Sequence, residues 1–171
     1  MVVLVIIGVL AAVATPSLTR DSTARKGREF ANIVAQSLQR AHLDAMNLRV
    51  NYQVRLCADS VAIFNPSIST TVPIRSVSAP AGVAIWDATT SLTDPAPTGR
   101  GLGDSGSSNC RLIYFNSMGN AGVTASAAAL ASWDIYVRNE NFNPVHPDGG
   151  FLISVTGLTA FVNTRNFTFS Q

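Results

Sequence analysis

The segment Met1-Val-Val-Leu-Val-Ile-Ile-Gly-Val-Leu-Ala-Ala-Val-Ala-Thr15 contains no charged residue, and Pro16 follows it directly. The chain then passes into Ser17-Leu-Thr-Arg20 and a basic helical pattern, so we interpret the run as a retained hydrophobic helix and not as a removed signal peptide. A helix that crosses a bilayer core needs about 20 apolar residues. Because this run is shorter, it either inserts shallowly or is preceded by further residues in the natural product, and we expect the second.

An amphipathic pattern extends this helix. Between Ser22 and Arg49, apolar residues recur at spacings of three and four, which places them on one helical face. We therefore expect one long helix over the first fifty residues. It would comprise a hydrophobic membrane or filament-core segment (1–19) and an amphipathic continuation (20–49) that packs on an apolar partner. The residues of the apolar face are Phe30, Val34, Leu38, Ala41, Ala45 and Leu48.

The sequence of residues 50–171 predicts a β-rich globular domain. Val50–Leu56 alternates apolar and polar residues, which is typical of a half-buried strand, whereas residues 87–109 predict a long surface loop. Gly119 and Gly157 are expected in turns that need a positive φ. The predicted fold class is α+β, with the long N-terminal helix packed on a small antiparallel β-sheet domain. The further expected strands are 61–64, 83–86, 111–115, 133–138, 151–155 and 158–162.

The stretch from Met1 to Leu18, with its Gly8 and Pro16, resembles the N-terminal helix of type IV pilin-like proteins. Leu112-Ile-Tyr-Phe-Asn-Ser-Met-Gly119, the Trp133–Arg138 strand and Ile153-Ser-Val-Thr-Gly157 resemble, in their order, the GspH/FimT group of minor pilins and pseudopilins. In that family a peptidase site, with a Gly before the cleaved bond and a Glu shortly after it, lies just upstream. Neither residue is present here, so the resemblance implies processing and methylation in residues that we expect ahead of Met1.

The resemblance also implies a function, that of a structural subunit of a type IV pilus or related filament. The expected role is a minor pilin that assembles through its N-terminal helix; the alternatives are a type II secretion pseudopilin and a DNA-binding minor pilin of a competence pilus. The implied partners are other pilin or pseudopilin subunits, the inner membrane before assembly, and an inner-membrane assembly platform. The implied location is the bacterial inner membrane, crossed once, and then an extracellular or periplasmic filament. The residues expected in the membrane and later in the filament core are Val5, Ile7, Gly8, Leu10 and Pro16.

The charge distribution leaves two interpretations open. The net charge of the whole chain is only +2, yet the first fifty residues carry Arg20, Arg25, Lys26, Arg28, Arg40 and Arg49 against three acids. Cations just beyond an apolar helix fit anionic lipid headgroups, and they equally fit a solvated helix face. The resemblance would place DNA contacts near the last Gly, where Arg165 is the nearest cation, and Arg138 is a second candidate. Because non-specific DNA affinity needs several cations together, DNA binding is the weaker alternative.

The two cysteines, Cys57 and Cys110, each lie at the end of an expected strand. In an envelope protein this favours a disulfide that holds the long loop against the sheet, and two buried free thiols are the alternative. Closing such a loop contributes roughly 4 kcal/mol in the chain-entropy model.

Several short motifs imitate catalytic or metal sites. Gly103-Asp-Ser-Gly-Ser107 and His42 are similar to the nucleophile loop and histidine of chymotrypsin-like proteases, but His42 belongs to the expected helix and the chain is too short for that fold. His146-Pro-Asp148 supplies two metal-binding side chains without a third, and Asn166-Phe-Thr168 fits a glycan acceptor pattern. We therefore expect no catalytic residue, no metal site, no cofactor and no enzyme activity.

Overall fold

The structure of the chain is a computed structural model, and it describes residues 2–87, 102, 110–124, 130–139 and 150–167. For residues 2–24, 87, 139 and 165–167 it describes the path of the backbone alone. The elements follow one another as a single long helix and nine strands within this part of the chain.

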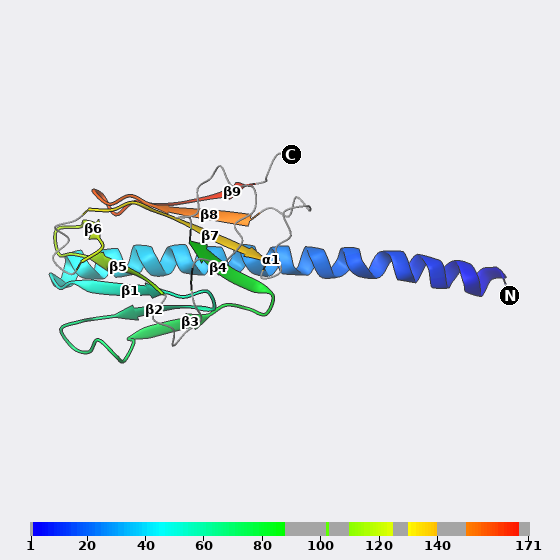
Figure 1. Ribbon diagram of the computed structural model, residues 1–171, viewed down its shortest axis with the longest axis horizontal. Coiled ribbons are helices and arrows are strands. Elements are labelled where there is room, and N and C mark those ends of the chain that lie inside the picture. Colours follow the sequence, from blue (N-terminus) through cyan, green and yellow to red (C-terminus); the bar gives the residue numbers. More distant parts are fainter. Residues whose placement is uncertain (1, 88–101, 103–109, 125–129, 140–149, 168–171) are drawn as a thin grey trace.

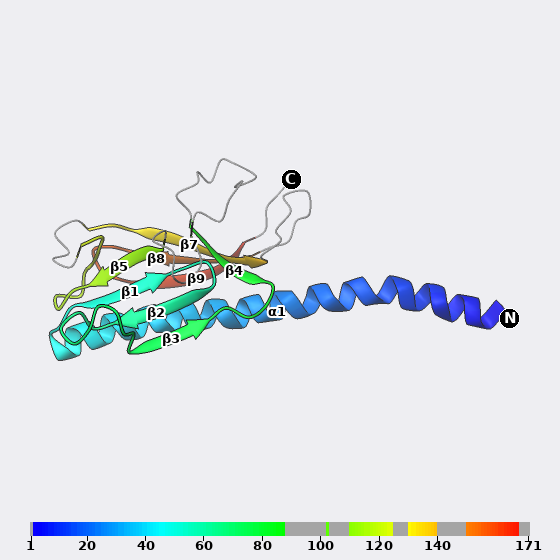
Figure 2. The same cartoon turned by 60° about the horizontal axis from the view of Figure 1, so that its bottom comes forward.

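Helix α1 spans Val2–Leu48, as the apolar run and the amphipathic pattern together predicted. Its C-terminal half lies along the strands, whereas its N-terminal half projects well beyond them (Figure 1). The projecting half is visibly bent (Figure 2), and it contains Pro16. A proline inside a helix removes one backbone hydrogen bond and clashes with the preceding turn, which is a common cause of such bends.

The helix ends in a left-handed cap. Arg49 has a φ of 54°, and the amide of Val50 donates to the carbonyl oxygen of Ala45 at 3.2 Å. This bond reaches back across the last turn and satisfies a carbonyl that the helix itself leaves open, as in a Schellman motif. The chain therefore turns sharply into the first strand.

The strands form two antiparallel sheets, which together make up the predicted antiparallel β-sheet domain. The first sheet has the order β3-β2-β1-β5-β6, and the second has the order β4-β7-β8-β9. In the first sheet, Val54 of β1 pairs with Ile63 of β2 on one side and with Ile113 of β5 on the other. The strands are β1 Tyr52–Leu56, β2 Ser60–Phe64, β3 Arg75–Ser78, β4 Val83–Asp87, β5 Arg111–Phe115, β6 Ala121–Gly122, β7 Trp133–Asn139, β8 Gly150–Val155 and β9 Val162–Phe167.

One strand prediction was wrong, and two strands were not predicted. The final strand was expected at 158–162, but β9 begins at Val162. The residues before it form a turn in which Thr156 donates its amide to the carbonyl oxygen of Phe161, and Ala160 adopts a φ of 46°. The short strands β3 and β6 were not predicted.

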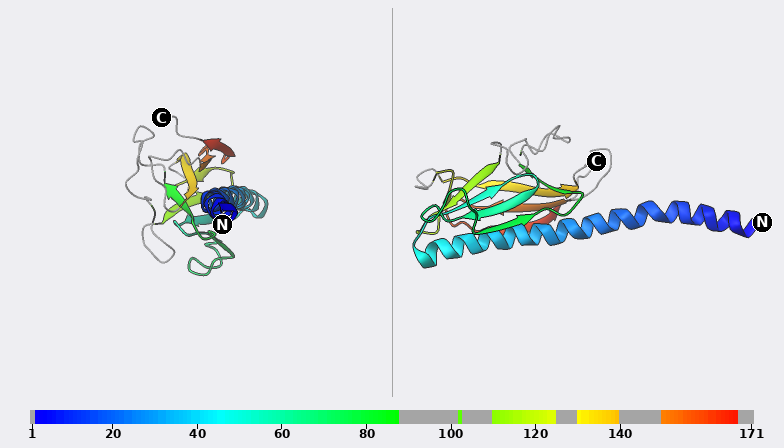
Figure 3. Two further views of the ribbon diagram at one scale, coloured as in Figure 1. Left: turned by 90° about the vertical axis from the view of Figure 1, so that its right-hand side faces the viewer. Right: turned by 90° about the horizontal axis from the view of Figure 1, so that it is seen from below.

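One core joins the helix to both sheets. The strands lie on one side of α1 when the molecule is seen from below (Figure 3, right). Phe30, Val34, Leu38, Ala41 and Ala45 are each at most 2% exposed, which confirms the predicted apolar face for these five residues. Leu48 was predicted on the same face but is 61% exposed, because the helix ends there. The inner faces of the sheets complete the core with Val54, Ile113, Phe115, Ile135, Val137, Ile153 and Val155.

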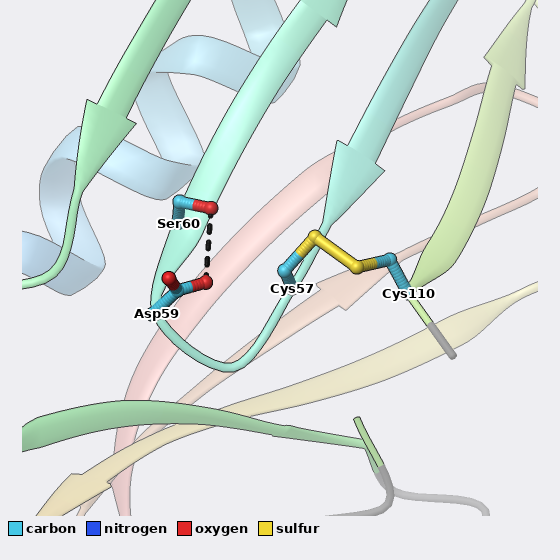
Figure 4. The surroundings of a disulfide bond; sticks show 4 residues. All are labelled: Cys57, Asp59, Ser60 and Cys110. Atoms are coloured by element: carbon cyan, nitrogen blue, oxygen red, sulfur yellow. Dashed lines mark hydrogen bonds between the residues drawn. A yellow bond between two sulfur atoms is a disulfide. The ribbon is translucent and has the colours of Figure 1, made fainter. Parts of the chain in front are cut away.

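A disulfide joins Cys57 to Cys110 across 53 positions of sequence, as predicted, and holds the end of β1 beside the start of β5 (Figure 4). The turn after Cys57 also connects the two sheets, because the carbonyl oxygen of Ala58 accepts a hydrogen bond from the amide of Ile85 in β4 at 2.8 Å. Within the turn, the hydroxyl of Ser60 donates to Asp59 Oδ1 at 3.1 Å (Figure 4). Covalent and hydrogen-bonded links thus meet at this corner of the domain.

Candidate assembly surfaces

The projecting half of α1 is the first candidate surface. Its sequence is uncharged through Thr15, and its backbone is helical from Val2 onward. At about 1.5 Å per residue, the stretch before Gly27 is roughly 38 Å long. Within the part of the chain that the structure describes, no helix is long and apolar enough to span a membrane. The residues predicted for a membrane or filament core belong to this half: Val5, Ile7, Gly8, Leu10 and Pro16.

The helix meets its own domain near Gly27. A Cβ atom at this position would lie 3.7 Å from the ring of Phe151 in β8, so the helix and the second sheet approach closely here. The cations Arg25, Lys26 and Arg28 are exposed on the same turns. A cationic collar therefore marks the boundary between the projecting half and the packed half of the helix.

At its other end the helix is fixed by a contact with the turn between β5 and β6. His42 lies with Nε2 3.2 Å from the carbonyl oxygen of Gly119, and its ring centroid lies 5.8 Å from that of Phe115. Burial lowers the pKa of His42 below its ordinary value, and the backbone hydrogen bond to Gly119 opposes this effect. A half-buried histidine favours its neutral form, which donates one hydrogen bond without the cost of a buried charge.

The geometry of the turn between β5 and β6 explains why residue 119 is a glycine. Gly119 has a φ of 84°, and a Cβ atom there would lie 2.9 Å from Met46 Sδ and 3.3 Å from His42 Nε2. The side chain of Asn116 shapes the turn, since its Oδ1 accepts hydrogen bonds from the amides of Met118 at 3.0 Å and Asn120 at 2.9 Å. Glycine thus satisfies both the backbone conformation and the close approach of the helix.

Gly157 has a different role from the one predicted. It is absent from the described glycines with a positive φ, which are Gly82 and Gly119. Instead, a Cβ atom at Gly157 would lie 2.5 Å from the carbonyl oxygen of Ala131. Its carbonyl oxygen also accepts from the amide of Ala121 at 2.8 Å, and its amide donates to Ser132 Oγ at 3.2 Å. Close packing of two backbone segments therefore requires glycine here.

Of the two candidate nucleic-acid contacts, Arg138 is poorly placed for that role. Arg138 is only 5% exposed, and its guanidinium carbon lies 5.0 Å from the ring centroid of Tyr136 and 5.4 Å from that of Trp86. Burial lowers the pKa of Arg138, and the electrostatic effect of Tyr136 opposes this. By register, Arg165 lies on the same face of the second sheet, two strands away, but its side chain is outside the described residues. Arg138 stabilises an aromatic cluster and offers little surface to a phosphate.

The motifs that imitate catalytic or metal sites are largely outside the described residues. This holds for Gly103–Ser107 and His146–Asp148, and for the side chain of Asn166. His42, the histidine of the protease-like pair, contacts Gly119 and Phe115. Among the residues that the structure describes, no three His, Cys, Asp or Glu side chains form a group that would hold a metal ion.

Comparison with solved structures shows the fold. The type IV minor pilin FimU of Pseudomonas aeruginosa matches with a TM-score of 0.55 and 13% identity, over 82% of this chain and 89% of that chain. The minor pseudopilin EpsH from the type 2 secretion system of Vibrio cholerae matches with a TM-score of 0.50 and 11% identity, over 84% of this chain and 97% of that chain. No protein-family model matches the sequence, and no curated protein matches it. The chain therefore has the pilin-like α+β fold that the sequence resemblance led us to expect.

Proposed function

We propose that the chain is a filament subunit of the type IV pilus class, a minor pilin, that assembles through the projecting half of α1. The observation that carries this proposal is that one continuous helix has an amphipathic half packed on its own domain and a half that extends beyond the domain and begins with an uncharged apolar run (Figure 1). The role is structural and not catalytic.

The apolar run of the helix needs an apolar partner. Apolar surface in contact with water costs about 25 cal/mol per Å² relative to burial, so a long exposed apolar helix is unfavourable. A helix satisfies its own backbone hydrogen bonds, so it is stable both in lipid and among other helices. We propose that segment 1–19 lies in the inner membrane before assembly and among the helices of other pilin subunits afterward. Segment 20–49 then carries the globular domain, 50–171, at the filament surface.

The cationic collar supports this arrangement. Arg25, Lys26 and Arg28 lie beyond the apolar run, where they would face the anionic headgroups of the membrane before assembly. An inner-membrane assembly platform would then transfer the helix from lipid to filament. Gly8 and Pro16 would allow the projecting half to adapt its curvature during this transfer, since both weaken the regular helix.

A type II secretion pseudopilin is the second candidate, because the likeness to EpsH covers nearly the whole of that pseudopilin. DNA binding receives less support, since Arg138 is buried. The pilus and the secretion system use the same physical mechanism for the helix. They differ in the structure that the subunit joins.

Quantitative mass spectrometry of filaments sheared from the native cells tests the proposal. We expect a processed, methylated N-terminal peptide and a low copy number relative to another pilin. Retention in the membrane with absence from sheared pili would favour the pseudopilin, and a high copy number would make the chain the shaft protein. Absence from both filaments and membrane would overturn the proposal, and a cytoplasmic marker protein controls for cell lysis.

A further inference from the structure

A cleft of about 420 Å³ lies between the packed half of α1 and strand β3. The helix covers the inner strands of the first sheet, and β3 forms the edge of that sheet beyond β2 (Figure 2). We call this cleft the arginine groove. It is lined by Arg40 and Asp44 from α1, Tyr52 from β1, Ile63 from β2, and Ile74 and Arg75 at the start of β3.

The arginine groove has an apolar floor and charged walls. Tyr52 and Ile63 are each 6% exposed and form the floor. On the helix wall, Arg40 Nε lies 3.8 Å from Asp44 Oδ2, so one cation has a carboxylate beside it. On the opposite wall, Arg75 is exposed and forms no ion pair within the part of the chain that the structure describes. The walls therefore carry a net positive charge.

The connection between β2 and β3 extends the apolar surface beside the groove. Ile68, Val72 and Ile74 are all more than half exposed in this connection. Large aliphatic side chains that gather on a surface commonly mark an interaction site, whereas scattered ones are ordinary. A partner that fits here must combine aliphatic side chains with a negative charge.

We propose that the arginine groove binds a segment of a different subunit of the filament, in which a carboxylate lies beside aliphatic residues. The carboxylate would pair with Arg75 and Arg40, and the aliphatic residues would cover Ile74, Val72 and the floor. This inference rests on the proposed function, since it identifies the neighbour with which the subunit assembles. Paired charges at such an interface determine partner choice more than overall affinity.

A second copy of the chain does not offer such a segment among its described residues. Four acidic side chains are described, and each is already engaged or lies among cations. Glu29 neighbours the collar residues Lys26 and Arg28; Asp44 belongs to the groove; Asp59 accepts a hydrogen bond from Ser60; and Asp134 accepts one from Ser154 at 2.5 Å. Among the residues that the structure describes, the charge pattern therefore favours a heterotypic contact.

A lipid headgroup is also a poor occupant. Arg40 lies 25 positions after Thr15, and at 1.5 Å per residue this is about 38 Å along the helix axis. That distance exceeds the thickness of the headgroup region of one leaflet, which is roughly 5–8 Å. The groove therefore lies well away from the membrane surface when the apolar run is inserted.

In vivo photo-crosslinking of the full chain tests this inference. A photoreactive benzoyl-phenylalanine replaces Val72, which is exposed beside the groove, and the cells are irradiated while they assemble filaments. We expect a crosslink to a different pilin-like subunit, at a peptide that carries Asp or Glu. The double variant Arg40→Glu with Arg75→Glu should lower the crosslink yield on the order of tenfold, which corresponds to about 1.4 kcal/mol. The matched control is Arg49→Glu, which changes an exposed cation outside the groove and should alter the yield less than about twofold.

A charge exchange completes the test. Replacing the crosslinked acid of the partner by Arg should restore the yield in the Arg40→Glu, Arg75→Glu variant. A crosslink to a second copy of the chain, to lipid or to nucleic acid, no crosslink in assembled filaments, or a yield that is independent of both arginines would each overturn the inference. Formation of the Cys57–Cys110 disulfide in every variant checks folding. The copy number of the wild-type chain in sheared filaments is measured in the same cells, so failure of the proposed function is distinguished from failure of this inference.

Discussion

The two halves of α1 are parts of one helix, yet they are stabilised differently. The packed half has seven buried apolar residues, and most of its exposed residues are polar, so a single domain can cover it. The projecting half has apolar residues on all faces of its sequence up to Thr15, so no one-sided partner can cover it. The comparison indicates that the pattern of apolar residues distinguishes the half of the helix that its own domain covers from the half for which we propose a separate partner.

The largest effect is expected from a charge in the projecting half. Val5→Asp or Ile7→Arg should abolish incorporation into filaments, because a charge at the centre of a membrane helix costs about 2.5–3.5 kcal/mol on insertion scales and the filament core is equally apolar. The measurement is the amount of the chain in sheared filaments. The domain should still form its disulfide, because these positions precede the packed half. Normal incorporation of either variant would show that the projecting half is not buried in the assembly.

In the packed half, substitution of a buried residue should destabilise the domain. Leu38→Ala should lower the free energy of unfolding by about 2–5 kcal/mol, since Leu38 is fully buried and truncation leaves a cavity. Urea denaturation of the full chain in detergent measures this loss. The matched control is Leu43→Ala on the same helix, where the side chain is 51% exposed and the expected change is within about 0.5 kcal/mol. Equal losses for the two variants would contradict the assignment of the buried face.

The end of the packed half should respond to a smaller change. Gly119→Ala should destabilise the domain by about 1–2 kcal/mol, because alanine pays a conformational cost at a φ of 84° and its Cβ atom would meet Met46 Sδ. Thermal unfolding measures the effect. In a Met46→Ala background the contact is absent, so the penalty of Gly119→Ala should become smaller there. An unchanged penalty would assign the whole effect to the backbone.

The smallest effect concerns pH. The folded pKa of His42 is lowered by burial, so its contribution to stability is complete above the unfolded pKa of about 6.5 and declines as the pH falls through that value toward the folded pKa. The difference in unfolding free energy between wild type and His42→Gln should therefore decrease on acidification below neutral pH. If the unfolding free energies of the two proteins change in parallel with pH, folding does not lower the pKa of His42. The variant supplies its own control, because all other titrating groups are common to both proteins.

The sequence predicted the helix well because a repeat of three and four residues is a local property of the chain. The prediction that Leu48 is buried was wrong, because the sequence pattern does not indicate the left-handed cap at Arg49 that ends the helix. It also placed the last strand too early. Leu158, Ala160 and Val162 alternate as a strand would, but Ala160 adopts a positive φ in a turn. Exposed β3 lacks the apolar alternation that reveals a strand, and its pairing with β2 is visible only in three dimensions.

The candidate surfaces were predictable to different degrees. The apolar run and the disulfide follow from residue type and order, and the disulfide is present in the structure. The burial of Arg138 was not predictable, because period-two alternation places it on the outer face of β7 without showing that Trp86 and Tyr136 flank it there. The arginine groove likewise brings together side chains from four consecutive elements, α1, β1, β2 and β3. Sites of this kind depend on tertiary packing, which a single sequence does not display.

The disulfide between Cys57 and Cys110 also determines what a proteolytic cut would do. The bond closes a loop across 53 positions of sequence, so cleavage of one peptide bond between the two cysteines would produce two fragments that remain joined through sulfur. The helix and β1 would stay attached to β5 and everything after it. The two fragments would therefore stay in one molecule until a reductant separated them, so the bond preserves the covalent continuity of the chain.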